Sequence, residues 1–214
     1  MTASKRFGWG ASLALVLPLV GCAASQVGDG GRRYPYSATH ISATIGQRSF
    51  EDSMWEPVDD HPLLGLGVEV QPSKSWVALD FAAHYGEDDT SRVVGGLGNV
   101  ELGIESWELS AGLYKELRFG DFPIRPYLGG GLAFLSVDAA ITDSAGATLF
   151  SDDDTTFAPY ARVGLLFDLY EGGQLGLDLR HLTAGDVDVG GVELDADYTQ
   201  LALVFRGRIV SSRP

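Results

Sequence analysis

The sequence predicts an all-β fold in which eight antiparallel strands close into one barrel. Three observations predict it. Apolar residues recur with a period of two rather than 3.6, eight segments show this alternation, and no long stretch has the pattern of an amphipathic helix. The chain has 214 residues, which fits one domain of ordinary size with short additional segments.

The eight predicted strands follow one another along residues 36–210. In chain order we expect them at 40–50, 63–71, 75–86, 100–118, 125–134, 157–169, 174–183 and 200–206. Each is identified by the side chains on its apolar face, which in the same order are Ile41, Ala43 and Ile45; Leu64, Leu66, Val68 and Val70; Val77, Leu79, Phe81, Ala83 and Tyr85; Trp107, Leu109, Ala111 and Leu113; Leu128, Gly130, Leu132 and Phe134; Phe157, Ala161, Val163, Leu165, Phe167 and Leu169; Leu175, Leu177 and Leu179; Leu201, Leu203 and Phe205.

Composition excludes several classes of function. Lys and Arg number 15 against 29 Asp and Glu, which gives a formal net charge of −14. This balance argues against nucleic acid as a partner, because a phosphate-binding surface needs clustered Lys and Arg. A single Cys permits neither an internal disulfide nor a Cys-based zinc site. The sequence has no Walker-type phosphate loop, paired-His metal motif or nucleophile elbow, so we expect no cofactor and no metal.

Residues 1–21 have the features of an export signal. Lys5 and Arg6 form a positive start, and the apolar stretch 11–20 is too short to span a bilayer as a helix. The run Leu19-Val20-Gly21-Cys22 resembles the lipobox of bacterial lipoproteins. The resemblance implies that Cys22 is linked to diacylglycerol and becomes the mature N-terminus.

The alternative is ordinary signal cleavage near Ala23, with Cys22 discarded. Residues 22–35 lack apolar periodicity and are expected to form a flexible tether. The barrel is expected over residues 36–210, followed by a short tail at 211–214.

The chemistry of the two strand faces distinguishes two kinds of barrel. In a soluble, lipocalin-like barrel the apolar face points inward, whereas in an outer-membrane barrel it meets lipid and the polar face fills the interior. The polar face here combines glycine with acids and arginines in near balance, which suits a narrow interior of paired charges. The residues expected in this interior charge network are Glu69, Asp80, Glu108, Arg125, Arg162, Asp168, Asp178, Arg180 and Arg206.

The connections between the strands alternate in length. The long ones are expected at 51–61, 87–99, 136–156 and 184–196, and the short ones at 71–74, 119–123 and 170–173. This alternation is typical of an outer-membrane barrel with long extracellular loops, short periplasmic turns and both termini in the periplasm. Together with the export signal, it predicts a transmembrane β-barrel in the outer membrane.

Two segments carry a family resemblance. Residues 125–133, RPYLGGGLA, and 195–203, DADYTQLAL, are similar to strands of small outer-membrane barrels, the family that includes the transmembrane domain of outer-membrane protein A. The resemblance implies outer-membrane lipid and lipopolysaccharide as surroundings and the barrel-assembly machinery as a partner. Two features depart from the family pattern. Phe205 is followed by nine further residues rather than ending the chain, and a lipobox is unusual on such a barrel.

His181 and Thr183 are the candidate catalytic residues. They lie two apart on the apolar face of a strand, a layout that resembles outer-membrane lipid A deacylases. An esterase needs a nucleophilic hydroxyl, a His base and an acid that orients the His. Here Thr183 replaces the expected Ser, and the sequence indicates no acid on the outer face of a neighbouring strand.

Acidic runs occupy three of the expected extracellular connections. They are 87–89, 152–154 and 186–197, and their spacing does not match a dedicated Ca²⁺ loop. We expect a solvated surface that offers a site for an extracellular partner.

The sequence thus predicts a non-enzymatic structural or surface-interaction role in the envelope. The alternatives are an outer-membrane esterase using His181 and Thr183, and a soluble periplasmic lipocalin-like binder of small apolar ligands.

Overall fold

A computed structural model describes residues 38–72, 75–94, 98–117, 119, 123–169 and 173–209. The expected export signal, Cys22, the tether and the tail lie outside the described residues. Among the residues described, no helix is long and apolar enough to cross a membrane.

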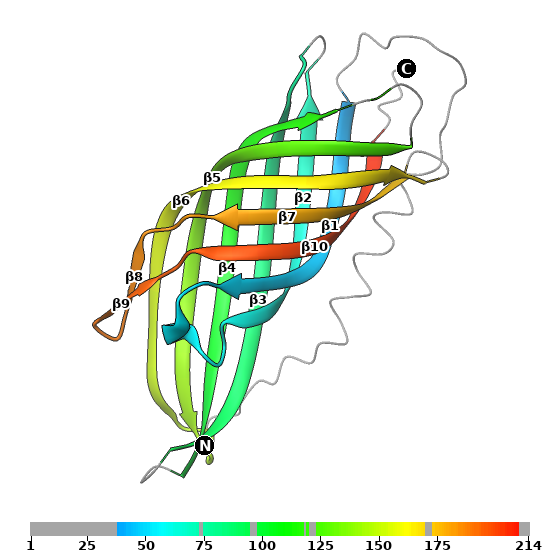
Figure 1. Ribbon diagram of the computed structural model, residues 1–214. Coiled ribbons are helices and arrows are strands. Elements are labelled where there is room, and N and C mark those ends of the chain that lie inside the picture. The colour runs from blue at the N-terminus through cyan, green and yellow to red at the C-terminus, as the bar shows by residue number, and fades with distance from the viewer. Residues whose placement is uncertain are drawn as a thin grey trace.

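Eight strands close into an antiparallel barrel, which confirms the predicted fold (Figure 1). Neighbours around the barrel are β1-β10-β7-β6-β5-β4-β3-β2, so each strand pairs with its chain neighbours except where a small hairpin intervenes between β7 and β10. The barrel strands are β1 (Ala38–Phe50), β2 (Asp60–Gln71), β3 (Ala78–Val94), β4 (Gly98–Glu116), β5 (Ile124–Asp143), β6 (Thr148–Asp168), β7 (Gly173–Leu182) and β10 (Tyr198–Ile209). The hairpin is β8 (Asp186–Val189) and β9 (Val192–Asp195), and a 3-10 turn, η1 (Ser53–Trp55), follows β1.

The register fixes how strongly the strands tilt. Pro126 on β5 pairs with Leu165 on β6. Following the directly paired residue from each strand to the next, once around the barrel, returns to β5 at Ser136. The return point is ten residues further along β5 than the start. Because ten is even, side chains that face inward on one strand are paired with inward-facing side chains all the way around the barrel. Spread over eight steps from strand to strand, each paired residue lies about one and a quarter residues higher along the barrel axis than the residue before it. We call this height along the axis the level of a residue.

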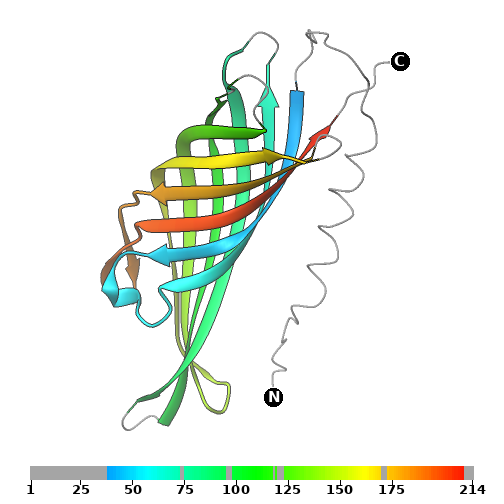
Figure 2. The ribbon, with the colours of Figure 1, turned by 45° about the vertical axis from the view of Figure 1, so that its right-hand side comes forward.

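Two of the expected loops are largely strand, which corrects the sequence reading. The segments 87–99 and 136–156 extend β3 to β6 beyond the rest of the barrel as a four-stranded sheet (Figure 2). Runs of acidic residues favour loops in the sequence, but here the strands pair through both runs, 87–89 and 152–154. At one tip, the Asp143 side chain accepts hydrogen bonds from the N–H groups of Ala145 and Ala147. This Asx-type turn reverses the chain within a few residues.

The expected loop 184–196 also contains structure, namely the β8–β9 hairpin. Gly190 and Gly191 form its turn with φ values of 68° and 78°, the left-handed conformation that a two-residue hairpin turn requires. The hairpin lies at the same end of the barrel as the four-stranded extension (Figure 1). We call this the long-loop end, and the opposite end the short-turn end.

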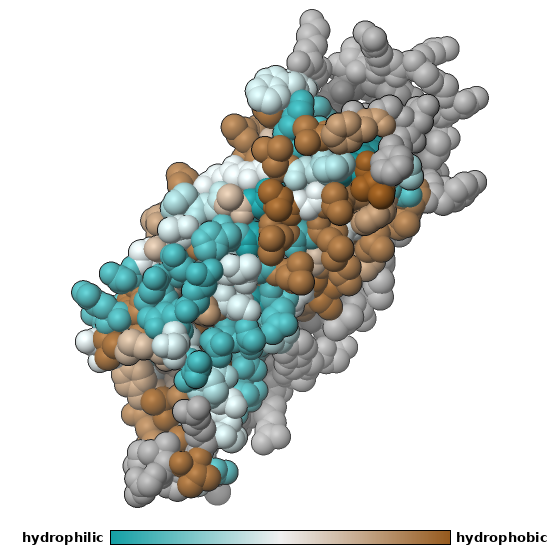
Figure 3. Space-filling model, viewed as in Figure 1, coloured by the Kyte–Doolittle hydropathy of each residue, from teal (hydrophilic) through white to brown (hydrophobic). Residues whose placement is uncertain are grey.

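The Leu, Val and Phe rows lie on the outer surface of the barrel. Leu109 is 59% exposed, Leu132 64% and Leu165 40%, whereas the polar face points inward. Figure 3 shows part of this apolar wall in brown towards the short-turn end. The lipocalin-like alternative required these rows to line an internal cavity, so the observed parity is opposite to the one that it needs.

Candidate functional site in the lumen and at the long-loop end

Glu108 is the centre of the first layer inside the barrel. Its fully buried carboxylate accepts a hydrogen bond from Arg48 Nη2 at 2.7 Å and forms a second ion pair with Arg180. The Tyr198 hydroxyl also donates to it, and His84 Nδ1 lies 3.5 Å away. Two guanidinium groups and one carboxylate from different strands therefore tie the lumen together, since a buried charge must be paired.

A second charged layer lies nearer the short-turn end. Arg162 is 3.3 Å from Asp80 and 3.5 Å from Glu69, and Arg206 forms ion pairs with both Glu69 and Glu116. Tyrosine hydroxyls satisfy further acids: Tyr127 donates to Asp178 and Tyr160 donates to Asp80 at 3.2 Å.

All nine residues expected in the interior network point inward, but they are not one cluster. Arg125 and Asp168 form a 2.5 Å ion pair at the short-turn mouth, where each is more than a quarter exposed. Strand alternation in the sequence puts His84, Tyr114, Tyr127 and Tyr160 on the same polar face, although it does not assign them to the network. Sequence reasoning missed four further lumen residues, which are Arg48, His61, Glu116 and Tyr198. Strand parity offered a signal for Arg48, because it shares a face with Ser42, Thr44 and Gly46.

Inward glycines make room for these long side chains. A Cβ atom at Gly112 would lie 2.5 Å from both the Tyr160 hydroxyl and the Gly130 carbonyl oxygen. Tyr160 in turn packs its ring against the Arg180 guanidinium, whose centre lies 3.8 Å from the ring centroid. The glycines on the polar strand face are therefore part of the packing of the charge network.

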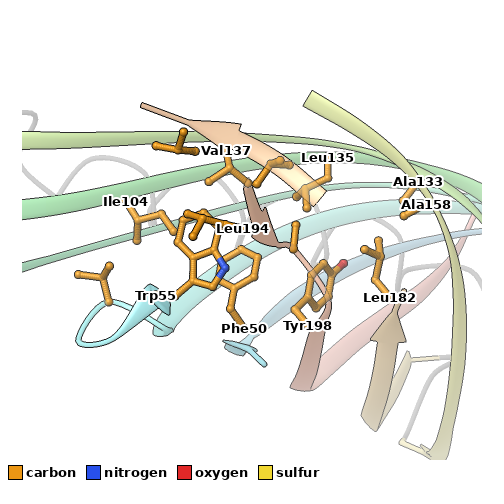
Figure 4. Close-up of a cluster of buried hydrophobic side chains, with 14 of the residues drawn as sticks. Phe50, Trp55, Ile104, Ala133, Leu135, Val137, Ala158, Leu182, Leu194 and Tyr198 are labelled. Atoms are coloured by element: carbon orange, nitrogen blue, oxygen red, sulfur yellow. The ribbon is translucent and has the colours of Figure 1, made fainter. Parts of the chain in front are cut away.

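An apolar core fills the lumen at the long-loop end (Figure 4). Leu135, Leu182 and Tyr198 have no solvent exposure, and Phe50 stacks on Trp55 of η1 with ring centroids 5.0 Å apart. The remaining buried members are Val58, Ile104, Ala133, Val137, Ala158, Tyr160, Val187, Val189, Leu194 and Ala196. Several of these come from β8 and β9, so the hairpin and η1 close this end of the barrel.

Two carboxylates hold the hairpin in place. Asp154 accepts a hydrogen bond from the N–H of Asp188 at 2.7 Å, and Asp152 accepts one from the N–H of Gly190 at 2.6 Å. These acids, expected in a solvated loop, instead bind the exposed edge of β8 to the sheet.

Little open space remains in the described lumen. One cavity of about 20 Å³ lies among the charged layers, beside Arg162, Asp178 and Arg206, which is room for about one water molecule. A larger cavity of about 540 Å³, with Tyr114, Glu116 and Arg206 in its lining, opens at the short-turn mouth. The charged layers and the apolar core lie between this mouth and the long-loop end.

The outer face of the four-stranded extension carries a row of acids. Glu87 pairs directly with Glu105, Glu105 with Asp138, and Asp138 with Asp153. Burial and then the carboxylates of Glu105 and Asp153 raise the pKa of Asp138. Among the described side chains, no group of three or more His, Cys, Asp or Glu is arranged to hold a metal ion.

His181 and Thr183 are exposed on the outer wall, on the face that sequence parity indicated. The imidazole contacts Thr199 rather than Thr183, with Nδ1 3.2 Å from the Thr199 hydroxyl. The sequence indicates no acidic partner for His181, but the structure contains one, because Glu51 Oε1 lies 3.3 Å from the same nitrogen. Sequence reasoning missed Glu51 because it follows β1 and reaches His181 across β10. An esterase relay uses the two imidazole nitrogens in turn, whereas here both partners meet Nδ1.

Comparison with known proteins agrees with this geometry. The family model described as outer membrane protein beta-barrel domain matches residues 12–205. No curated protein matches the chain.

Several solved structures share the fold. OprG from Pseudomonas aeruginosa is 13% identical with a TM-score of 0.56, and the match covers 83% of this chain and 98% of that one. A major outer membrane protein from Thermus thermophilus is 11% identical with a TM-score of 0.55, covering 81% and 99%. Neisserial surface protein A is 14% identical with a TM-score of 0.51, covering 80% and 96%. At these identities the likeness concerns the fold alone.

Proposed function

The chain belongs to the outer membrane protein beta-barrel domain family, and from this premise we propose that it is a non-enzymatic, non-conducting protein that acts through its long-loop end. Membership of this family places it in the outer membrane. The finer role, a structural and surface-interaction one, rests on how the barrel is filled.

One observation carries the proposal, which is the apolar core beneath the β8–β9 hairpin. Leu135, Leu182 and Tyr198 are fully buried where a pore would need an open, wetted path. Below them, Arg48 and Arg180 are held by Glu108 across the lumen. An eight-stranded barrel is just wide enough for side chains to fill. Here apolar side chains fill the lumen at the long-loop end, and ion-paired side chains fill it towards the short-turn end.

Conductance in planar bilayers tests the proposal. We expect the purified wild-type protein to give no discrete current steps. An established porin in the same bilayers is the positive control, because the charged layers would keep this lumen closed even in a variant without the apolar core. Regular current steps from the wild type would overturn the proposal.

The long-loop end is proposed to face the outside of the cell, with the short-turn end in the periplasm. Thr39 pairs with Ile209, so both ends of the described chain lie at the short-turn end, where membrane barrels commonly keep their termini. In intact cells, an epitope inserted at the β8–β9 turn should then bind antibody. Antibody binding only after the cells are broken open would reverse the orientation.

The acidic extension is the proposed contact surface. It places Glu87, Glu105, Asp138 and Asp153 side by side on one face of a sheet that extends past the apolar wall. Phosphatidylcholine vesicles carrying the protein should bind amine-coated beads more than carboxylate-coated beads. Changing these four acids to the corresponding amides should reduce that difference, and an unchanged preference would exclude this surface.

We also propose a membrane anchor at the short-turn end, which rests on the lipobox. If Cys22 is lipidated, the 15 residues between it and β1 would tether the barrel to the leaflet at the short-turn end. Incorporation of labelled palmitate in the wild type and its loss in Cys22→Ala test this; equal labelling of both would exclude Cys22.

A further inference from the structure

A row of polar side chains interrupts the apolar outer wall on one side of the barrel. His181 on β7 pairs with Thr199 on β10, and Thr199 pairs with Ser49 on β1, so the three lie side by side on the outer face. Gln47 on β1 and Thr183 after β7 are exposed beside them. We call these five residues the polar notch. Figure 3, which faces β7, β10 and β1, shows the hydrophilic surface in teal beside the brown apolar wall.

The notch residues are hydrogen-bonded to two neighbouring acids and are open to their surroundings. The Thr199 hydroxyl donates to Glu51 at 3.0 Å, and His181 lies between them in contact with both. The Ser49 hydroxyl donates to Asp60 on β2. Even so, the side chains of His181 and Glu51 are 46% and 52% exposed.

The notch lies at a level where the other side of the barrel is still apolar. Counting about one and a quarter residues per strand step, His181 is level with Leu109 and Leu132, and Ser49 is level with Trp107 and Phe157. Those four side chains are 53% to 75% exposed on the outer wall. The surface at the notch therefore falls within the height that lipid covers elsewhere.

The apolar wall ends nearer the short-turn end over β7, β10 and β1 than it does on the opposite strand. Its last exposed members there are Leu179, Leu201 and Ile45, which lie below the level of Leu109 and Trp107 on β4, the strand opposite β10. Acyl chains at the notch would therefore meet polar side chains.

The functional groups of the notch determine which kind of ligand can bind there. Its hydroxyl, amide and imidazole groups, with the Glu51 carboxylate beside them, donate and accept hydrogen bonds, as sugar hydroxyls do. Glu51 and Asp60 disfavour a bare phosphate, because like charges repel. We propose that the polar notch binds the saccharide headgroup of a glycolipid in the outer leaflet. The assignment of the leaflet rests on the proposed orientation of the barrel.

Reconstitution into phosphatidylcholine vesicles tests the notch directly. The wild type and a His181→Leu/Thr199→Val variant are unfolded in urea, with or without the neutral glycolipid digalactosyl diacylglycerol. We expect the glycolipid to raise the midpoint of the wild type, since a ligand of the native state stabilises it. The variant should gain nothing from the glycolipid, but should have a higher midpoint than the wild type in phosphatidylcholine alone.

Thr155→Val supplies the matched control, because Thr155 is an exposed outward hydroxyl on β6, beyond the aromatic residues. It should respond to the glycolipid as the wild type does. Equal glycolipid shifts in the wild type and the double variant would overturn the proposal. So would a wild-type shift with anionic phosphatidylglycerol and none with the glycolipid. If the protein conducted ions, the proposed function would be wrong, but the expected effect of the glycolipid on the urea midpoint would be the same.

Discussion

Arg48 Nη2 and Glu108 Oε2 lie 2.7 Å apart, and neither side chain has any solvent exposure. The two residues come from β1 and β4, which are not neighbours in the barrel, so the ion pair crosses the lumen. A pair of this kind holds opposite walls together, and its removal leaves a charge with no water to solvate it.

Glu108→Gln should therefore be strongly destabilising. The change leaves the Arg48 and Arg180 guanidinium groups buried without their shared carboxylate, and breaking a buried pair typically costs about 3–5 kcal/mol. The midpoint of urea unfolding in vesicles, followed by gel mobility of unboiled samples, measures the cost. Glu116→Gln is the control at the more exposed mouth and should cost less. Equal losses in the two variants would contradict the central role of Glu108.

How the lumen is packed leads to a second prediction. Gly112→Ala places a Cβ atom 2.5 Å from the Gly130 carbonyl oxygen, which is backbone and moves only with its strand, and 2.5 Å from the Tyr160 hydroxyl. We expect a loss of about 2 kcal/mol, the usual cost of overpacking. Tyr160→Phe removes the hydroxyl and should recover part of the loss in the double variant. Ala111→Leu, on the outer face of the same strand, should leave the unfolding midpoint nearly unchanged.

Strand parity made most of the barrel predictable. Once Leu, Val and Phe rows face lipid, every residue of opposite parity must face inward, which is why Glu108 and Arg180 were found from the sequence. Two things were not predictable. The acidic residues of β3 to β6 suggested loops because charge alone does not reveal strand pairing, and Glu51 reaches His181 only because the chain turns after β1. Contacts between elements distant in sequence have no local signal.

The acid row predicts a pH dependence. Burial and then neighbouring carboxylates raise the pKa of Asp138 in the folded state. A raised folded-state pKa gives stability that is fully present below the ordinary pKa of an Asp and is lost as pH rises through the folded value. The extension should therefore be more stable in mild acid than at neutral pH. Asp138→Asn should add about 0.5 kcal/mol at neutral pH, as expected for relieving like charges across strands.

Amide hydrogen exchange of residues 136–155, corrected for intrinsic rates, measures this effect. Protection should fall from mild acid to neutral pH in the wild type and change less in Asp138→Asn. The amides of β7 in the same sample serve as the internal control, because they lie away from the acid row. Protection that rises towards neutral pH would show that the acids are stabilised rather than opposed by their neighbours.

The outer wall gives the last prediction, which depends on depth. Leu165→Arg places a charge on the lipid-facing surface of β6 and should cost about 2–4 kcal/mol in a bilayer. Leu109→Arg on β4 should behave similarly, since Leu109 is also outward and 59% exposed. Thr155→Arg is the matched control on the same strand as Leu165. It lies beyond the aromatic residues, where the cost falls towards zero. Unfolding in vesicles should separate Leu165→Arg from Thr155→Arg. If both cost the same, position relative to the bilayer is irrelevant and the wall does not face lipid.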